Sequence, residues 1–540
     1  MKKIVLLLLL ISFNSYSQKS LSSDYDYSIS QPYQSIDGEE YFFNYNDEII
    51  IVKRDKKNVI IQKFSTDKPT ELKHTEYSIS DIFPKNWVME GVEQINDVIY
   101  FFYSSYEGKE TLNERLYSKK ITFKEGIFEP GFDKQIISTN GKVANNLQSG
   151  RAARFAFNYG FNGNDKFQIT KSNNRIVAKY RRVSKEIKEK DLEIIGMQVF
   201  DGNLEKIWEN DFTMPYPDDQ IKLLDYTMDD NGNVYILIKK YDDGSKKDKK
   251  DKKDGTANYN MELFKFSKES KNAVITKIVV GDKFIEEVGI FKGPNDTMFC
   301  GGYFSDGGRK SGVNGIFSFK IDADGSLVDK KMFEIPLEIL NQYENNKTER
   351  RNTRNEDKDK ADYKNLKLKK IYFQSDGTIT FFGEEVYYKE LNSKNGTRYI
   401  YYNDDILVSQ ITASGEMGWT IKIPKRQISG QTGYGISFSH FFKNGFHYVI
   451  FLDNIKNIDL PNDKVPATHT EGHGGYLTAV KIDNNGEYTK GSIMDLRNVK
   501  GNLELSDFDK DAIIADSENN FYMEFSKSRK EDVLVKVELK

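Results

Sequence analysis

The chain is poor in the residues that most often build cross-links and cofactor sites. It has one cysteine, Cys300, and five histidines among 540 residues. A single cysteine excludes an intrachain disulfide framework and any zinc or iron–sulfur site built from several cysteines. Lys and Arg number 79 against 82 Asp and Glu. Because neither sign dominates, the composition argues against a dedicated nucleic-acid binder.

Catalytic signatures are lacking as well. The sequence holds no Gly-x-Ser-x-Gly elbow, no His-Glu-x-x-His motif and no phosphate-binding glycine-rich loop. Cys300 falls within a predicted strand, where we expect a buried, inert thiol. Aromatic residues nevertheless make up 13% of the chain, which supplies the buried area that disordered chains lack. The sequence therefore predicts a folded protein and points to no enzyme class.

The N-terminus predicts a cleaved signal peptide over residues 1–17. Lys2 and Lys3 precede the eight apolar residues Ile4–Ile11, and Ser15 and Ser17 form a small-x-small cleavage site. A membrane-spanning helix needs roughly 20 apolar residues, so this run is too short to be one. We expect the mature chain, residues 18–540, to be exported without a transmembrane segment. A periplasmic location is preferred to an extracellular one, since the tail reads as a strand and not as a sorting domain.

A pair of strands recurs along the chain. A turn rich in Asn, Asp and Gly leads into an aromatic or β-branched strand, and a second strand follows. The first type of strand lies at residues 46–51, 96–102, 173–178, 230–237, 295–299, 376–382, 443–449 and 518–523. The second type lies at residues 59–64, 116–121, 196–200, 262–266, 316–321, 406–411, 476–482 and 533–537. Eight copies spaced by roughly 65–70 residues indicate a repeat architecture.

This pattern resembles the β-propeller superfold, whose blades are four-stranded antiparallel sheets around a channel. The resemblance implies an all-β domain of seven or eight blades over residues 18–540. The last copy ends at the C-terminus without a closing strand, and residues 25–30 alternate like a strand ahead of the first unit. We therefore expect the N- and C-terminal strands to pair and close the ring, which protects exposed edges. A linear stack or two successive β-sandwiches is the alternative.

Two charged stretches interrupt the repeat, near residues 239–258 and 345–366. Both mix Lys or Arg with Asp or Glu and have few apolar positions. Such runs bury too little surface to offset the entropy of ordering them. We interpret them as solvated loop insertions, with a partner-binding arm as the alternative.

One segment carries a candidate metal site. His469, Glu471 and His473 alternate, so an extended backbone places the three side chains on one side. Imidazole and carboxylate groups are suitable ligands for zinc and related divalent ions. The spacing matches no recognised zinc signature, and a structured loop is the alternative interpretation. No other cofactor is expected.

A candidate binding surface lies on a predicted tyrosine-rich hairpin, and Tyr and Arg are enriched at interaction hot spots. It consists of Tyr387, Tyr388, Arg398, Tyr399, Tyr401 and Tyr402. Ordinary strand aromatics are the alternative.

From the predicted ring and the missing catalytic motifs, we expect an exported, non-enzymatic binding scaffold for a protein of the bacterial cell envelope. Two alternatives stay open at this point: a metal- or carboxylate-dependent hydrolase or lyase acting on an extracellular polymer, and a glycan-binding module.

Overall fold

The computed structural model describes residues 21–540 apart from a number of gaps. The gaps are residues 37, 108–112, 140, 142, 145–165, 183–191, 245, 249, 252–255, 308–311, 357–360, 394–395, 431–434, 462, 471–474, 500–501, 506–512, 517 and 529. The predicted signal peptide lies outside the described residues, so its assignment stays a prediction.

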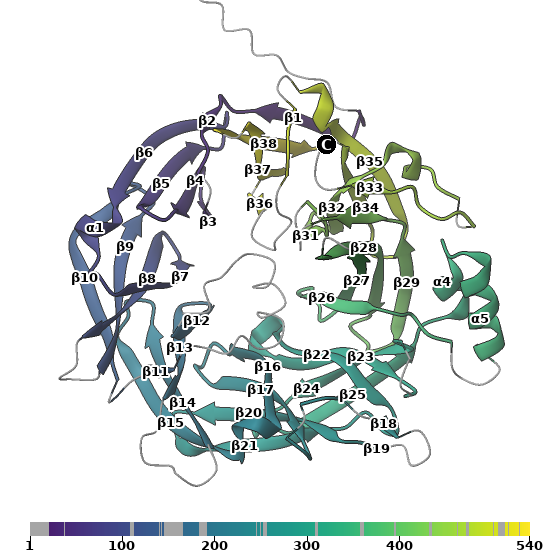
Figure 1. The fold of residues 1–540 in the computed structure, drawn as a ribbon, viewed down its shortest axis with the longest axis horizontal. Helices are drawn as coiled ribbons and strands as arrows, with labels where there is room; N and C mark the ends of the chain where they lie inside the picture. The colour runs from purple at the N-terminus through teal and green to yellow at the C-terminus, as the bar shows by residue number, and fades with distance from the viewer. Residues whose placement is uncertain are drawn as a thin grey trace, which may run out of the picture.

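The described chain forms eight four-stranded antiparallel sheets arranged around a centre (Figure 1). The strands of the first four sheets, from the inside outward, are β3 (Glu39–Tyr45), β4 (Glu48–Arg54), β5 (Asn58–Ser65) and β6 (Thr70–Ser78); β7 (Trp87–Ile95), β8 (Val98–Glu107), β9 (Asn113–Thr122) and β10 (Phe128–Ser138); β12 (Phe167–Ser172), β13 (Arg175–Arg182), β14 (Leu192–Asp201) and β15 (Lys206–Pro217); and β16 (Ile221–Met228), β17 (Val234–Tyr241), β20 (Tyr259–Ser267) and β21 (Ser270–Ile278). The short strand β11 (Val143–Ala144) also pairs with β13.

The other four sheets repeat this order. Their strands are β22 (Phe284–Lys292), β23 (Met298–Ser305), β24 (Gly315–Ile321) and β25 (Leu327–Glu334); β26 (Leu366–Phe373), β27 (Ile379–Ser393), β28 (Gly396–Ile411) and β29 (Met417–Ile423); β31 (Ser439–Lys443), β32 (Phe446–Asp453), β34 (Tyr476–Ile482) and β35 (Tyr488–Asp495); and β36 (Ile514–Ala515), β37 (Asn520–Ser528), β38 (Glu531–Leu539) and β1 (Tyr25–Ile29). This architecture is an eight-bladed β-propeller, and it settles the predicted blade number of seven or eight.

The recurring turn residues have the backbone geometry that the sequence predicts. In five sheets the turn between the first two strands holds an Asn at positive φ: Asn46, Asn96, Asn173, Asn295 and Asn444. Asn populates this left-handed region more readily than most residues because its short side chain bonds the local backbone. These turns therefore separate consecutive strands at the positions that the sequence repeat predicts.

The hydrophobic core lies between neighbouring sheets and not within one central cluster. Eight buried clusters occur, each joining two adjacent sheets. One of them packs Ile49 and Ile51 of the first sheet against Tyr522 and Leu534 of the last. Successive side chains of a strand point to opposite faces of its sheet, and a neighbouring sheet covers each face. Both faces are therefore buried, which explains the long apolar runs of the second strands.

The two ends of the chain meet in the last sheet. β1 pairs antiparallel with β38, from Tyr25 opposite Leu539 to Ile29 opposite Val535. A second short strand, β2 (Tyr33–Gln34), also pairs with β38. The predicted pairing of the terminal strands is confirmed, and it covers the edge that β38 would otherwise expose.

Two outer strands carry a tryptophan at comparable positions. Trp208 lies in β15 and Trp419 in β29. The indole N–H of Trp208 donates to the carbonyl of Gly232 at 3.0 Å, and that of Trp419 to the carbonyl of Asn484 at 3.0 Å. Each acceptor belongs to the following sheet, so both tryptophans join neighbouring blades.

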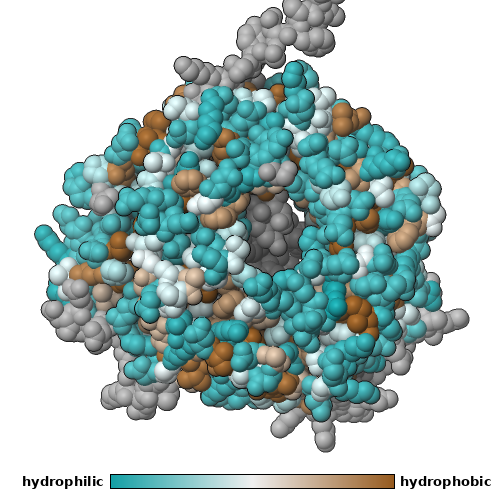
Figure 2. Space-filling view, turned by 180° about the vertical axis from the view of Figure 1, so that it is seen from behind, coloured by the Kyte–Doolittle hydropathy of each residue, from teal (hydrophilic) through white to brown (hydrophobic). Residues whose placement is uncertain are grey.

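Among the described residues, the helices are short and lie in the connections. They are α1 (Ile79–Ile82), α4 (Leu337–Asn341) and α5 (Asn346–Glu356), with single 3-10 turns at η1 (Asp218–Gln220), η2 (Pro294–Asp296), η3 (Ile455–Asn457) and η4 (Leu496–Asn498). α5 occupies much of the second charged stretch, and the first stretch holds the two-residue strands β18 (Lys250–Asp251) and β19 (Thr256–Ala257). The ring seen from its other side is hollowed at the centre (Figure 2). The domain limits and the role of the insertions stay predictions.

Candidate functional site

One hairpin departs from the blade pattern. β27 and β28, the middle strands of the sixth sheet, have 15 and 16 residues, whereas the middle strands of the other sheets have 7 to 10. β26 pairs with β27 only as far as Glu385, opposite Leu366. Beyond that point the two strands continue together to Ser393 opposite Gly396. β30 (Gln427–Ser429) still pairs with β28 as far as Tyr401, so the five residues Lys389–Ser393, about 16 Å of extended chain, continue past every other strand of the sheet.

The sequence accounts for this extension. Tyr and Ile residues dominate its second strand, and both types favour the pleated conformation. Gly396, where the second strand begins, has φ of +119°, a value that residues with a side chain rarely adopt. We call residues 386–403 the extended hairpin.

One face of the extended hairpin is internally packed. The rings of Tyr387 and Tyr402, directly opposite each other, stack with centroids 4.6 Å apart and planes at 3°. The ammonium of Lys389 lies 4.5 Å from the Tyr402 ring centroid. The Tyr387 hydroxyl donates to Asp404 Oδ2 at 3.0 Å. These contacts link the two strands of the hairpin near its base.

The other face presents tyrosines to solvent. Tyr388 is 62% exposed and Tyr399 is 44% exposed, and their rings meet edge to face with centroids 5.7 Å apart. Tyr401 lies opposite Tyr388 in register and is half-buried. We call Tyr388, Tyr399 and Tyr401 the tyrosine face. Arg398 is exposed near the tip.

The structure thus brings all six predicted surface residues onto one hairpin, but it divides their roles. Tyr388, Arg398 and Tyr399 are exposed and Tyr401 is half-buried. Tyr387 is half-buried, and Tyr402, the ring stacked against it, is only 8% exposed. Their use in binding stays a prediction.

A buried ion network anchors the hairpin at its base. Glu384 and Lys425 are both fully buried, and Lys425 Nζ lies 2.8 Å from Glu384 Oε1. The other carboxylate oxygen, Oε2, lies 2.9 Å from Lys369 Nζ and accepts from Asn403 Nδ2 at 2.7 Å and Ser437 Oγ at 2.8 Å. Burial alone would raise the pKa of Glu384, but the two ammonium groups lower it to about 2. The carboxylate is ionised at any physiological pH.

A second group of charges lies around the bulge beside Glu384. Burial, together with the nearby carboxylates of Asp404 and Asp405, raises the pKa of Glu385 to about 8. Burial also raises the pKa of Asp405 to about 6, although Lys422 opposes this shift. Lys422 Nζ lies 3.2 Å from Glu344 Oε1, just after α4, and 3.4 Å from Asp405 Oδ2. Lys422 thus links Asp405 at the hairpin base to the segment that follows α4.

Glu384 and Glu385 do not form a hydrolytic pair. A glycosidase needs two carboxyl groups that flank an accessible cleft. Both oxygens of Glu384 are occupied by cations and donors, and its side chain is inaccessible to solvent. The opposed pKa shifts have separate causes: two lysines lower the pKa of Glu384, whereas burial and the neighbouring aspartates raise that of Glu385.

The predicted metal segment joins the same sheet. His469 begins β33 (His469–Thr470), which pairs in parallel with β30 (Gln427–Ser429), and β30 pairs with β28 beside the extended hairpin. His469 is buried, and a side chain on Gly475 would approach its ring to 2.5 Å. Gly475 therefore allows close packing against His469. Glu471 and His473 lie outside the described residues, so the three-ligand site stays a prediction.

Two other histidines form a buried pair between the sixth and seventh sheets. His440 Nε2 and His447 Nδ1 lie 2.9 Å apart, and His447 Nε2 lies 3.2 Å from Thr380 Oγ1. Burial lowers the pKa of His447 to about 4 and that of His440 well below its usual value. Both are therefore neutral structural residues at physiological pH.

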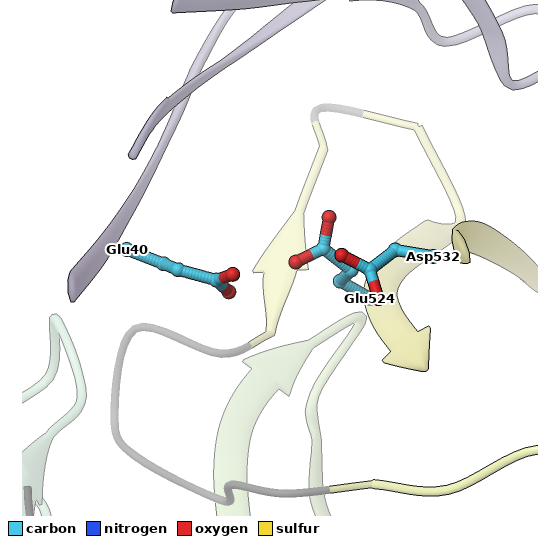
Figure 3. Close-up of side chains that lie close together, drawn as sticks. All are labelled: Glu40, Glu524 and Asp532. Carbon is cyan, nitrogen blue, oxygen red and sulfur yellow. The ribbon is translucent and has the colours of Figure 1, made fainter. Parts of the chain in front are cut away.

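The carboxylate group most suited to a metal ion among the described residues was not predicted from sequence. Glu40, Glu524 and Asp532 come from β3, β37 and β38 and bring one oxygen each within 4.8 Å of one another (Figure 3). Lys53 Nζ lies 3.0, 2.8 and 3.3 Å from these three carboxylates and is fully buried. The lysine supplies the positive charge that a metal would supply, so the cluster joins the first and last sheets. No sequence signal pairs residues some 480 positions apart.

Comparisons with known proteins place the chain in no family. No family model matches it, and no curated protein matches it. An uncharacterised protein of Listeria monocytogenes is similar over 80% of this chain and 88% of its own, at 9% identity and a TM-score of 0.36. The β-propeller domain of the trilobed protease of Pyrococcus furiosus covers 72% of this chain and 97% of its own, at 8% identity and a TM-score of 0.29.

A mutant of the Synechocystis apocarotenoid oxygenase covers 71% of this chain and 70% of its own, at 6% identity and a TM-score of 0.31. Similarity at this level carries no argument about activity, and the fold assignment rests on the strand pairing of the chain itself. Within the described residues, no helix is long and apolar enough to cross a membrane.

Proposed function

We propose that the protein is an exported, non-enzymatic scaffold of the cell envelope that binds a protein partner through the extended hairpin. The observation that carries this proposal is the exposure of Tyr388 and Tyr399 on a hairpin whose base is held by a buried ion network. Isolated hairpins are marginal in water, so a long one needs such an anchor to present a defined surface. A preorganised surface loses less entropy on binding.

The composition of the hairpin suits a protein partner. Tyrosine offers a large amphipathic contact area with few rotatable bonds, and Arg adds directed hydrogen bonds. Eleven large hydrophobic side chains are exposed among the described residues, and five of them lie on the hairpin or in the neighbouring 453–470 connection of the seventh sheet: Tyr388, Leu391, Tyr399, Ile455 and Val465. Lys389 and Arg398 are exposed on the opposite face of the same hairpin, so a partner that grips the hairpin from both faces would combine apolar side chains with carboxylates.

Site-specific photo-crosslinking tests the proposal. A photoreactive phenylalanine analogue replaces Tyr388 or Tyr399 in cells, and a third variant carries it at Leu72, which is 55% exposed on β6 in the first sheet. We expect a discrete protein adduct from positions 388 and 399 and none from position 72. With the partner identified, Tyr388→Ser should weaken its affinity about 30-fold, the loss expected for a hot-spot aromatic.

The two alternatives give different outcomes. Binding on a glycan array that Tyr388→Ser abolishes, without a protein adduct, would instead support a glycan-binding module. Turnover of an extracellular polymer, lost on chelation and in the His469→Ala variant, would support the hydrolase or lyase. Equal adducts at positions 388 and 72 would contradict the proposed surface.

A further inference from the structure

One edge of the extended hairpin is left open by the chain. The N–H of Val386 donates to the carbonyl of Asn365, just before β26, at 2.9 Å. Asn365 has φ of +58°, and the chain leaves the line of β26 there, since Tyr363 pairs instead with Val313, ahead of β24. Residues 387–393 of β27 therefore pair with β28 alone among the described strands.

Three residues of this stretch direct their backbone groups outward. In an antiparallel ladder, the N–H and C=O of one residue point to the same side, and those of the next residue point to the other. The N–H of Val386 points to the side of β26, and the register is regular from there to the end of the strand. The backbone groups of Tyr388, Glu390 and Asn392 therefore point away from β28, and within the described chain they bond no other backbone group. All three residues are exposed.

This open edge lacks the irregularities of the other edges. Among the described strands, the outer strands of seven sheets pair with their neighbours through a register shift, and β1, the outer strand of the eighth, has only five residues. Residues 387–393 contain no shift, no proline and no glycine. Lys389, the charge that would guard the edge, lies over the Tyr402 ring of its own hairpin. Proteins normally protect exposed edges by such irregularities and charges, so a regular open edge is a template for another strand.

We propose that the protein partner adds a strand to this edge, in the line that β26 leaves at Asn365. The inference rests on the proposed function and specifies how the partner binds. The added strand runs antiparallel to β27, as β26 and β28 do, and forms backbone hydrogen bonds with Tyr388, Glu390 and Asn392. Its side chains alternate between the two faces of the hairpin, so one set lies beside Tyr388 and the other beside Leu391, which is 48% exposed.

The side chains along the edge specify the chemistry of the partner segment. Directly opposite residues of an antiparallel pair share a face and interact. Tyr388 and Leu391 favour aromatic or β-branched residues opposite them. Lys389 favours a carboxylate, and Glu390 favours Lys or Arg. The partner segment, read from its N-terminus, is therefore apolar, basic, acidic and apolar.

A second copy of the chain does not satisfy this rule. Full antiparallel overlap of residues 387–393 with the same residues of a copy sets Glu390 opposite Glu390. Like charges directly opposite each other are destabilising. The charge pattern therefore favours an extended segment of a different protein.

Two labelled synthetic peptides test the charge pattern by fluorescence anisotropy with the full chain. One is Thr-Thr-Val-Lys-Glu-Ile-Thr with capped ends, and its control exchanges the Lys and the Glu. We expect the first to bind about 5-fold more tightly, because the exchange turns two attractive cross-strand pairs into repulsive ones. The Lys389→Glu/Glu390→Lys variant should reverse this preference. Equal affinities, or no saturable binding of either peptide, overturn the added strand.

A matched pair of proline variants tests the edge itself. Asn392 and Thr397 lie directly opposite each other and share a side-chain hydrogen bond of 2.7 Å, which either substitution removes. Asn392→Pro blocks the open edge of β27 and spares the bonds to β28, whereas Thr397→Pro blocks the edge of β28. With the photoreactive residue at position 388, Asn392→Pro should lower the adduct yield at least 10-fold. Thr397→Pro should keep the yield within 2-fold of the parent protein.

The outcomes separate this inference from the proposed function. Equal adduct yields in the two proline variants overturn the added strand and leave the proposed binding surface in place. Absence of an adduct from the parent protein contradicts the proposed function and the added strand together. A dimer in sedimentation velocity that Asn392→Pro abolishes makes a second copy the occupant and overturns the choice of partner.

Discussion

Replacing Glu384 by glutamine tests the anchor of the extended hairpin. Glu384→Gln keeps the size of the side chain and removes its charge. The change leaves Lys425 buried without its counter-ion, although the carbonyl of Asn403 and the side chain of Gln427 still accept its hydrogen bonds at 2.7 and 2.9 Å. The new amide group also faces Lys369, itself a donor.

The structure gives the size of the effect. The pKa of Glu384 falls from 4.5 to about 2, because the two ammonium groups outweigh the effect of burial. A shift of this size corresponds to about 3 kcal/mol in favour of the ionised form at neutral pH. Removing one partner of a buried pair typically costs about 3–5 kcal/mol. We therefore expect Glu384→Gln to lower the free energy of unfolding by about 3–5 kcal/mol at pH 7.

Guanidinium unfolding followed by tryptophan fluorescence measures this free energy, with Glu390→Gln on the exposed hairpin as the control. The native pKa of Glu384 lies below the unfolded value, so its contribution is complete above about pH 4.5 and disappears as the pH falls toward 2. The difference between wild type and variant should shrink over that window. A Glu384→Gln protein within 0.5 kcal/mol of the wild type at pH 7 would refute the reasoning.

Four further substitutions follow from the same structure. Because the native pKa of His447 lies near 4, the wild type should lose about 2 kcal/mol between pH 7 and 4.5 that His447→Gln does not lose, as measured by urea unfolding at both pH values; equal losses would contradict this. Glu385 retains a proton in the native state up to about pH 8, so its burial penalises the wild type increasingly as the pH rises from 4.5. Glu385→Gln should therefore be about 3 kcal/mol more stable than the wild type at pH 7 and equally stable at pH 4, and a variant less stable at pH 7 would exclude the assigned shift. Tyr402→Ser should cost about 3 kcal/mol because it removes a buried, stacked ring, whereas Tyr388→Ser should stay within about 0.5 kcal/mol, and thermal unfolding that ranks them the other way would reverse the two faces of the hairpin.

The sequence was sufficient to predict the architecture because its signals are local. Turn residues such as Asn96 and the alternating strands after them repeat in every sheet, and the unpaired last copy predicted the role of residues 25–30. The first copy, at residues 46–51 and 59–64, also forms a complete sheet with β3 and β6 on either side.

The candidate site was predictable only in part, because its chemistry depends on distant pairing. The tyrosine-rich composition of the extended hairpin is evident from the sequence. The sequence alone does not show that Tyr402 is buried while Tyr388 is exposed. The ion networks were not predicted from sequence. Lys53, near the end of an apolar strand in the first sheet, pairs with carboxylates of the last sheet, and no local pattern indicates such a distant contact. His469 reaches the sixth sheet through a parallel pairing that no local pattern indicates.

The pairing of the two chain ends supports the ring on which every site depends, and a cysteine pair tests it directly. Asp26 and Glu538 lie opposite each other in the β1–β38 register. Opposed residues in antiparallel strands are close enough for a disulfide after small adjustments. Oxidised Asp26→Cys/Glu538→Cys protein should form this bond nearly completely, and Asp26→Cys/Glu531→Cys should not. Equal cross-linking in the two variants, or none in either, would contradict the closed eight-bladed ring.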